Sequence, residues 1–394
     1  NDGTWPQLPP PDPWLNRQMR LQAGLLLPER RIGLAAHDYQ QAVAAAEVVL
    51  SRAVRDAEAE TVPSRWLSRL TNLMGGLPAQ GGPAALAAMQ ARGLKWLRLA
   101  AALETPTAAL PPAPRPAPRP PVAARPKALP VTAIKTLIRD PYAIYARTIL
   151  GLKKLDPLHQ SPDARLRGSA LHSILERFVR ERQTETRTMA RARLLAIAAQ
   201  VLATEAPWPA ARALWLARLE RAADFFLTFD TADGGTPVLL EQPGAITLAA
   251  LPFALTARPD RIDILPDGRL HIVDYKTGVP PTLPQQQQFD KQLLLEAAMA
   301  ERGAFVALAP REVAKVSYVG LGSSPKVVET GITADLLAEV WADLHKLITR
   351  YQSPAQGYLS RRAVFQEREG GDYDHLARYG EWDQSDPPHP EDVE

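Results

Sequence analysis

The sequence predicts a mixed α/β fold, and three observations support that class. Apolar runs bounded by turn residues predict strands, and apolar residues at spacings of three and four predict helices. The helices precede, interrupt and follow the strands, which is typical of a sheet covered by helices. We expect strands at about 246 to 256, 258 to 265, 269 to 276 and 313 to 320, and helices over 132 to 150, 167 to 228, about 287 to 301 and 333 to 350.

A proline-rich run divides the chain. Residues 106–130 contain 10 prolines and show neither a helical nor a strand period. Each proline fixes φ and removes a backbone donor, so the run predicts an extended, semi-rigid linker. It separates region 1–105, whose apolar spacing predicts mainly helix, from region 131–394, which holds all the expected strands.

The composition excludes several kinds of site. The chain has no cysteine, which excludes a disulfide framework, a thiolate zinc site and an iron–sulfur cluster held by this chain. No run approaches the roughly 20 apolar residues of a membrane helix, and no Gly-x-x-x-x-Gly-Lys-Ser/Thr loop is present to bind ATP. We therefore expect a cytoplasmic protein with no membrane contact and no ATP site. The first residue is Asn1 instead of Met, which suggests a piece of a longer polypeptide.

The net charge of +3 is unevenly distributed. Between Leu110 and Gln200, 17 Lys and Arg stand against 6 Asp and Glu. A local basic excess of this size fits a surface that faces phosphates. It fits a solvated, Arg-rich helix equally well.

A hairpin carries the candidate chemistry. Leu265-Pro266-Asp267-Gly268 is a strong turn signal. In a hairpin symmetric about Asp267, Ile264 faces Leu270, Ile262 faces Ile272, and Asp260 faces Asp274. Lys276, two residues beyond Asp274, shares their face. Two opposed carboxylates destabilise each other unless a cation or a shared proton intervenes, so the pattern favours a divalent metal over a surface salt-bridge cluster.

Two further residues are weaker candidates. On a helix, Gly168, His172 and Glu176 share one face, and the imidazole of His172 could ligate a metal. A lone helical histidine is more often structural. Gln292 opens a predicted helix after the hairpin, where an isolated glutamine is usually a surface residue.

Taken in order, these residues resemble the RecB-type branch of the PD-(D/E)xK nuclease superfamily, whose restriction-endonuclease-like core is a central mixed sheet flanked by helices. The matching stretches are Gly168-x-x-x-His172-x-x-Leu175-Glu176, Asp260-Arg261-Ile262-Asp263, Val273-Asp274-Tyr275-Lys276-Thr277-Gly278 and the helix at Gln292. The resemblance implies that Mg²⁺ or Mn²⁺ is ligated by His172, Asp260, Asp274 and the Tyr275 carbonyl. It also implies that Lys276 orients the attacking water or stabilises the transition state, and that Gln292 orders the site or contacts DNA.

Other stretches resemble the AddB-type subunit of bacterial helicase–nucleases in its alphaproteobacterial form. They include Asp140-Pro141-Tyr142, Gly371-Asp372-Tyr373, Glu381-Trp382, Ala36-His37-Asp38-Tyr39 and Pro63-Ser64-Arg65-Trp66-Leu67. This resemblance implies that 1–105 is the end of a helicase-like region and that 131–394 is the nuclease domain. It further implies a Mg²⁺-dependent exonuclease that cuts single strands of DNA unwound at double-strand breaks, for recombinational repair, beside an AddA-like helicase–nuclease subunit.

Two alternatives stay open on the sequence. The first is a catalytically inactive nuclease fold that binds DNA or scaffolds a partner helicase; the intact Asp260, Asp274 and Lys276 argue against it. The second is a metal-dependent hydrolase of RNA or another phosphodiester, which would need the same charges at its active centre.

Overall fold

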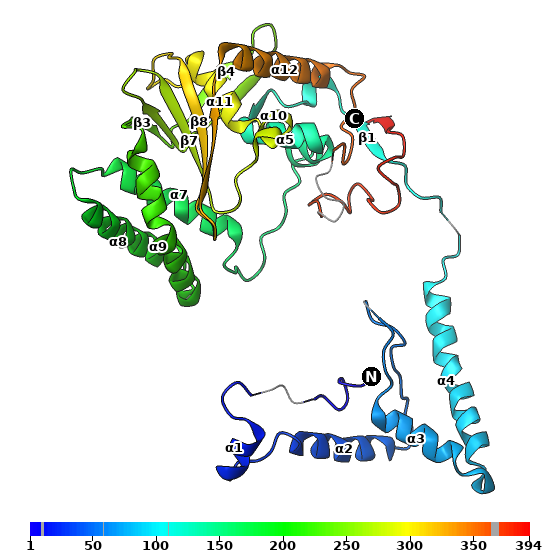
Figure 1. Ribbon diagram of the computed structural model, residues 1–394. Helices are drawn as coiled ribbons and strands as arrows, with labels where there is room; N and C mark the ends of the chain where they lie inside the picture. The colour runs from blue at the N-terminus through cyan, green and yellow to red at the C-terminus, as the bar shows by residue number, and fades with distance from the viewer. Residues whose placement is uncertain (9–11, 58, 109, 364–369) are drawn as a thin grey trace. The chain divides into compact units, whose positions relative to one another are not determined.

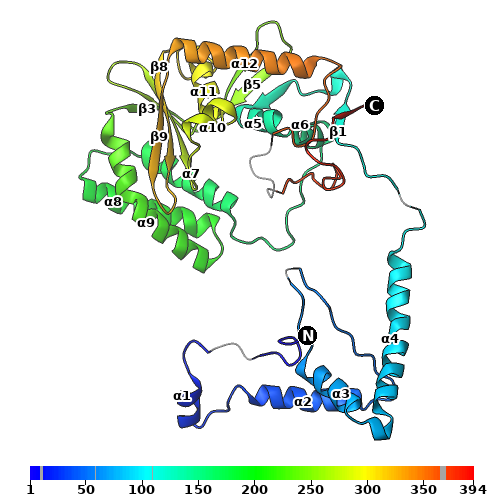
Figure 2. The same cartoon turned by 45° about the vertical axis from the view of Figure 1, so that its right-hand side comes forward.

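The computed structural model describes residues 1–8, 12–57, 59–108, 110–363 and 370–394. The chain forms two compact units, Asn1–Pro111 and Pro112–Glu394. Figures 1 and 2 show both units from two directions.

Unit 1 is mainly helical, as the sequence predicted. A cluster of three aromatic rings, from Trp5, Tyr39 and Trp66, has centroids 5.2 to 5.7 Å apart, and Trp66 is buried. Aromatic rings at these spacings contribute contact energy beyond the area that they bury. The helices of unit 1 are α1 (Arg17–Gln22), α2 (Arg30–Val43), α3 (Arg65–Gly75), the short η1 (Pro78–Gln80) and α4 (Gly82–Glu104).

Unit 2 is built on a five-stranded mixed sheet in the order β3-β6-β7-β8-β9. The strands are β3 (Thr236–Leu240), β6 (Arg261–Ile264), β7 (Leu270–Lys276), β8 (Val313–Gly320) and β9 (Lys326–Gly331). β7 and β8 are parallel, and the other neighbours are antiparallel. A parallel pair needs a crossover connection, and the helices α10 (Leu283–Gln288) and α11 (Gln292–Glu301) provide it.

The predicted hairpin register is confirmed. Ile262 pairs with Ile272 and Ile264 pairs with Leu270 across β6 and β7. The turn between them contains Gly268 at a φ of 85°, a conformation that glycine adopts without steric cost. Asp260 lies immediately before β6, so it meets β7 through its side chain and not through the strand ladder.

Alternating residues of β7 enter two separate cores on opposite faces of the sheet. Leu270 and Ile272 pack with α5 (Val131–Arg139), α11 and α12 (Ala334–Gln352). Val273 and Tyr275 pack with the other helical layer, which is α7 (Ala164–Arg180), α8 (Arg187–Glu205) and α9 (Pro209–Ala232). Both views show these layers on either side of the sheet. Because both faces of the sheet are covered, β7 is buried on both faces from Leu270 to Tyr275.

Several expected element bounds were wrong. The helix expected over 132–150 is α5, then α6 (Pro141–Ile144) and a π-helical turn, η3 (Tyr145–Ile149). Pro141 explains the break, because proline disfavours helical backbone in the residue before it and Asp140 has a φ of −139°. The helix expected over 167–228 is three helices. The strand expected over 246–256 is β4 (Gly244–Thr247) and β5 (Ala254–Ala257), which pair antiparallel, and the helix expected from 287 begins at Gln292 after the separate α10.

The expected linker over 106–130 also needs correction. Residues 112–130 of this run belong to unit 2 and contain β1 (Pro116–Arg119), η2 (Val122–Ala124) and β2 (Ala128–Pro130). β1 pairs in parallel with β10 (His389–Asp392), and β2 pairs in parallel with β5. Proline fits in β1 because Pro116 and Pro118 act there as acceptors: their carbonyls accept the backbone N–H groups of Ser360 and Tyr358 at 3.1 and 2.9 Å.

Candidate active site

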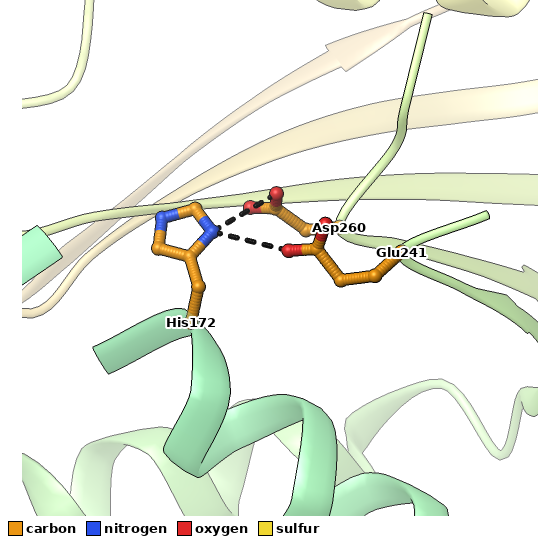
Figure 3. Close-up of side chains that lie close together, drawn as sticks. All are labelled: His172, Glu241 and Asp260. Carbon is orange, nitrogen blue, oxygen red and sulfur yellow. Dashed lines mark hydrogen bonds and ion pairs between the residues drawn. The ribbon is translucent and has the colours of Figure 1, made fainter. Parts of the chain in front are cut away.

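His172, Asp260 and Glu241 converge at one end of the sheet. His172 projects from α7, and its Nδ1 lies 3.1 Å from Asp260 Oδ1 and 3.5 Å from Glu241 Oε1 (Figure 3). All three side chains are partly buried. The donor atoms of the three residues lie within 4.8 Å of one another, which is the spacing expected of ligands to a single cation.

Asp260 is fixed to β7. The backbone N–H of Tyr275 donates to Asp260 Oδ2 at 2.7 Å. This bond holds the carboxylate beside Asp274 although Asp260 itself precedes β6. Its other oxygen, Oδ1, faces His172.

Glu241 is a site residue that the sequence analysis missed. It follows β3 directly, and because Leu240 pairs with Arg261, the residues that come next, Glu241 and Asp260, lie side by side. Its φ of 50° is unusual for a residue with a side chain and costs conformational energy. Arg258 compensates, since its Nε lies 3.0 Å from Glu241 Oε2 and donates to the Glu241 carbonyl at 2.7 Å. The signal was the short apolar strand β3, which the sequence analysis did not recognise.

Asp274 links β7 to α11, which packs on the face of the sheet opposite α7, α8 and α9. It lies on β7 with a residue exposure of 2%. Lys276 Nζ lies 2.7 Å from Asp274 Oδ2, and Gln292, the first residue of α11, donates its side-chain amide to Asp274 Oδ1 at 2.8 Å. The predicted residues Asp260, Asp274, Lys276 and Gln292 are therefore brought together, with His172 reaching them from the opposite helical layer.

Burial and charge oppose each other in the Asp274–Lys276 pair. Burial raises the pKa of Asp274 to about 6, with Lys276 opposing this rise and Asp260 adding to it. Burial would lower the pKa of Lys276, but Asp274, with smaller contributions from Asp260 and Glu296, outweighs burial and raises that pKa. The lysine is thus held as a cation beside the carboxylates.

The pKa of the His172 imidazole also depends on its neighbours. Burial lowers its pKa, but hydrogen bonds to Asp260 and Glu241 outweigh burial and raise the pKa to about 10. The Asp260 and Glu241 carboxylates thus face the same imidazole, and a cation bound among the three residues would offset the repulsion between the two carboxylates.

Glu296 is a second residue that the sequence analysis did not assign. It lies one helical turn after Gln292 with 1% exposure, and its Oε1 accepts from Gln292 Nε2 at 3.2 Å. Within the described residues, its Oε2 has no hydrogen-bond partner. Burial raises the pKa of Glu296 well above its usual value, and the charges of Asp274 and Asp260 raise it further. Gln292 Nε2 thus donates to Glu296 on one side and to Asp274 on the other.

The donor set suits a hard divalent cation. One imidazole and several carboxylate oxygens are typical ligands of Mn²⁺ and compatible with Mg²⁺. His172 and Asp260 belong to the convergent set, as expected, and Glu241 joins them. Asp274 lies outside this set but close enough to Asp260 for the charge of that carboxylate to raise the pKa of Asp274. Tyr275 turns its side chain into the α7–α9 core, its N–H serves Asp260, and ligation by its carbonyl stays a prediction.

A second acidic group, of Asp233, His271 and Glu329, lies elsewhere on the sheet. There the chain supplies its own cation: Lys315 Nζ lies 2.9 Å from Asp233 and 2.7 Å from Glu329. That group is therefore a structural ion cluster.

A comparison with known proteins shows the family to which this chain belongs. A family model described as the PD-(D/E)XK nuclease superfamily matches residues 128–369, more than half of the chain. The chain belongs to this superfamily. The residues in the superfamily's name stand here at Pro259-Asp260 and Asp274-Tyr275-Lys276, which are the residues that the structure brings together.

Individual relatives are more distant. An uncharacterized protein of Rickettsia felis is 29% identical over 206 residues, a match that covers 50% of this chain and 24% of that protein. One from Rickettsia bellii is 28% identical over 185 residues, covering 46% of this chain and 22% of that protein. The matched part of this chain thus spans about a quarter of these relatives. A solved structure of a candidate exonuclease from Eubacterium rectale is 11% identical and covers 64% of this chain and 93% of its own, with a TM-score of 0.36.

Within the described residues, no helix combines the length and the apolar character that crossing a bilayer requires.

Proposed function

We propose that this chain is a metal-dependent deoxyribonuclease that hydrolyses phosphodiester bonds of single-stranded DNA. The observation that supports this most strongly is the convergence of His172, Glu241 and Asp260 beside the Asp274–Lys276 pair. A bound Mg²⁺ or Mn²⁺ would activate water and neutralise charge on the phosphate. We expect His172, Glu241 and Asp260 to hold it, with Asp274 completing the set.

The other residues act on the same reaction. Water attacks phosphorus, the phosphorus–oxygen bond to the leaving sugar breaks, and that oxygen takes up a proton. The Lys276 ammonium, held as a cation by Asp274, orients the attacking water or stabilises the negative charge that grows on the phosphate. Gln292 fixes Asp274 through its amide, so it acts as a positioning residue.

We further propose the biological setting that the flanking stretches suggest. Their resemblance to AddB-type subunits supports an exonuclease that degrades strands unwound at double-strand breaks. It would do so together with an AddA-like helicase–nuclease subunit. The membership in a nuclease superfamily is compatible with this setting.

Digestion of end-labelled single-stranded DNA tests the activity. The full chain would be incubated with Mg²⁺, with Mn²⁺ and with EDTA, alone and with the AddA-like subunit, next to Asp274→Ala. Metal-dependent cleavage that the substitution abolishes is the expected result. Absence of cleavage even with the partner subunit would indicate an inactive DNA-binding module, and preferential cleavage of an RNA of the same sequence would replace DNA as the substrate.

A further inference from the structure

A cleft opens beside the catalytic residues. Its volume is about 480 Å³, and the lining residues that matter here are Lys135, Arg139, Lys276, Phe289, Gln292 and Tyr318. Lys276 and Gln292 also belong to the candidate active site. A ligand bound in this cleft would therefore lie directly beside these two residues of the site.

The side of the cleft that α5 forms is basic. Lys135 and Arg139 are four residues apart on α5 and so lie on one face of that helix. Lys135 Nζ lies 2.5 Å from Asp290 Oδ1, and Arg139 Nε donates to the Ala363 carbonyl at 3.2 Å. Among the described lining residues, Asp290 is the one carboxylate beside Lys135, Arg139 and Lys276, and Lys276 also contacts Asp274, which lies outside this lining. The excess of positive charge points to an anionic ligand.

An aromatic ring lies against one of these cations. Phe289 follows α10, is half-buried, and its ring centroid is 5.7 Å from the Arg139 guanidinium carbon. Lys276 Nζ lies 5.6 Å from the ring centroid of the buried Tyr318. Cations along a groove with an accessible aromatic face are the combination that binds nucleic acid single strands, because phosphates pair with the cations and unpaired bases stack on the ring.

We propose that this cleft seats the DNA strand next to the scissile phosphate, with backbone phosphates at Lys135 and Arg139 and an unpaired base on Phe289. The inference rests on the proposed function, since it names the path by which the substrate reaches Lys276. The occupant is a single strand and not a duplex, because a base inside a duplex already stacks on its neighbours and cannot cover Phe289.

Equilibrium binding tests the cleft without requiring chemistry. The full chain is titrated into a fluorescent single-stranded DNA of about 20 nucleotides in EDTA, and anisotropy is measured over a range of salt. The variants are Lys135→Ala, Lys135→Arg, Phe289→Leu and Phe289→Tyr. Arg311→Ala is the matched control, because this exposed arginine contacts the Gly268 carbonyl at the other end of β7, roughly 20 Å from Lys276 at about 3.3 Å per residue.

The expected results differ by variant. Phe289→Leu keeps an apolar side chain but removes the aromatic face, and should weaken single-strand binding about tenfold. Lys135→Ala should weaken it and reduce the slope of log K against log salt by about 0.7, the value for one lost phosphate contact on a single strand. Phe289→Tyr, Lys135→Arg and Arg311→Ala should bind like the unsubstituted chain. In cleavage assays, the weakened variants should raise KM more than they lower kcat.

Other results would overturn the inference. These are binding by Phe289→Leu and Lys135→Ala equal to that of Arg311→Ala, an equal loss of duplex binding by Phe289→Leu, or tighter binding of an RNA strand of the same sequence. If the unsubstituted chain cleaves DNA while these variants keep its KM, the cleft assignment fails and the nuclease stands. If the chain binds single strands through the cleft but cleaves none with metal and partner, the proposed function fails instead.

Discussion

Lys276 Nζ contacts Asp274 Oδ2 at 2.7 Å, from a position two residues further along β7 on the same face of the sheet. Helix α11 contacts the pair as well, because Gln292 donates a hydrogen bond to the other oxygen of Asp274, Oδ1. Each oxygen of this buried carboxylate thus has one polar neighbour that also belongs to the site. The geometry ties the charge of the lysine to that of the aspartate.

Substitution of either member should abolish cleavage and keep the fold. Asp274→Asn and Lys276→Met should each lower kcat by about 10²-fold or more, the loss typical of one group that stabilises a transition state. Asp274→Asn keeps the shape of the side chain and removes a charge whose pKa is raised in the folded protein, so at pH 7.5 the free energy of unfolding should not fall. Single-strand digestion and urea unfolding, with the exposed Asp335→Asn as control, measure both quantities. A variant that unfolds would contradict the account of the pair.

Glu296 should act through a proton and not through a charge. Burial raises the pKa of Glu296, so the folded protein favours its neutral form. Glu296→Gln keeps a neutral group of the same shape, and at pH 8 it should be at least as stable as the unsubstituted chain and nearly as active. Glu296→Ala removes the group that holds the Gln292 amide and should cost about 1–3 kcal/mol of unfolding free energy, with a lower kcat. Thermal unfolding and cleavage rates distinguish them; a large loss of kcat in Glu296→Gln would show that the carboxylate itself is required.

Glu241 should be a metal ligand. Glu241→Gln keeps the shape of the side chain but removes one charge from the set with His172 and Asp260. The affinity for Mn²⁺ should fall at least about tenfold, since even outer-shell partners of a metal have effects of that size. Calorimetric titration with Mn²⁺ measures the change, and Glu329→Gln in the Lys315 cluster is the control. Unchanged Mn²⁺ affinity would limit Glu241 to orienting His172.

His271 should make stability depend on pH. Burial lowers its pKa to about 4, and Lys315 lowers it further against the opposing effect of Asp233. Because its pKa in the unfolded chain is about 6.5, the unfolded state binds more protons between these values. The stabilisation is complete above pH 6.5 and is lost as the pH falls towards 4, by about 2 kcal/mol at pH 5.

Denaturant unfolding at pH 7.5 and pH 5 checks this prediction. His271→Gln should lose about 2 kcal/mol less between the two pH values than the unsubstituted chain does. The comparison uses the difference between pH values, so any constant cost of replacing the hydrogen bond to Ser317 cancels. Equal losses in both proteins would exclude His271 as the titrating group.

The hairpin and its chemistry could be predicted because their signals are local. A turn with Pro266, Asp267 and Gly268 fixes the register, and the alternation of β7 then places Asp274 and Lys276 on one face. The mixed α/β class, the helix that begins at Gln292 and the strand over 313–320 follow from patterns of the same kind. Each of these inferences uses residues close together in the sequence.

The rest of the site depends on contacts between distant segments. Glu241 joins Asp260 only because β3 pairs with β6, and β3 is a short apolar run with no alternation to reveal it. Glu296 is buried because α11 packs against β7, which its helical pattern alone does not specify. Likewise, the proline-rich run predicts a linker because proline has no backbone N–H to donate. Pro116 and Pro118 can join β1 because the distant residues Ser360 and Tyr358 donate to their carbonyls.

The pairing of β1 with β10 has a mechanical consequence. β1 begins just after the start of unit 2 and β10 ends two residues before its last residue. Because these strands are parallel, a force pulling the two ends of the unit apart acts along the strands and shears them. Their backbone bonds, such as those from His389 to Arg115 and from Val393 to Arg119, then bear the load together instead of opening one after another. The β1–β10 pair would therefore resist a force applied to the two ends of unit 2 before the rest of the unit bears that force.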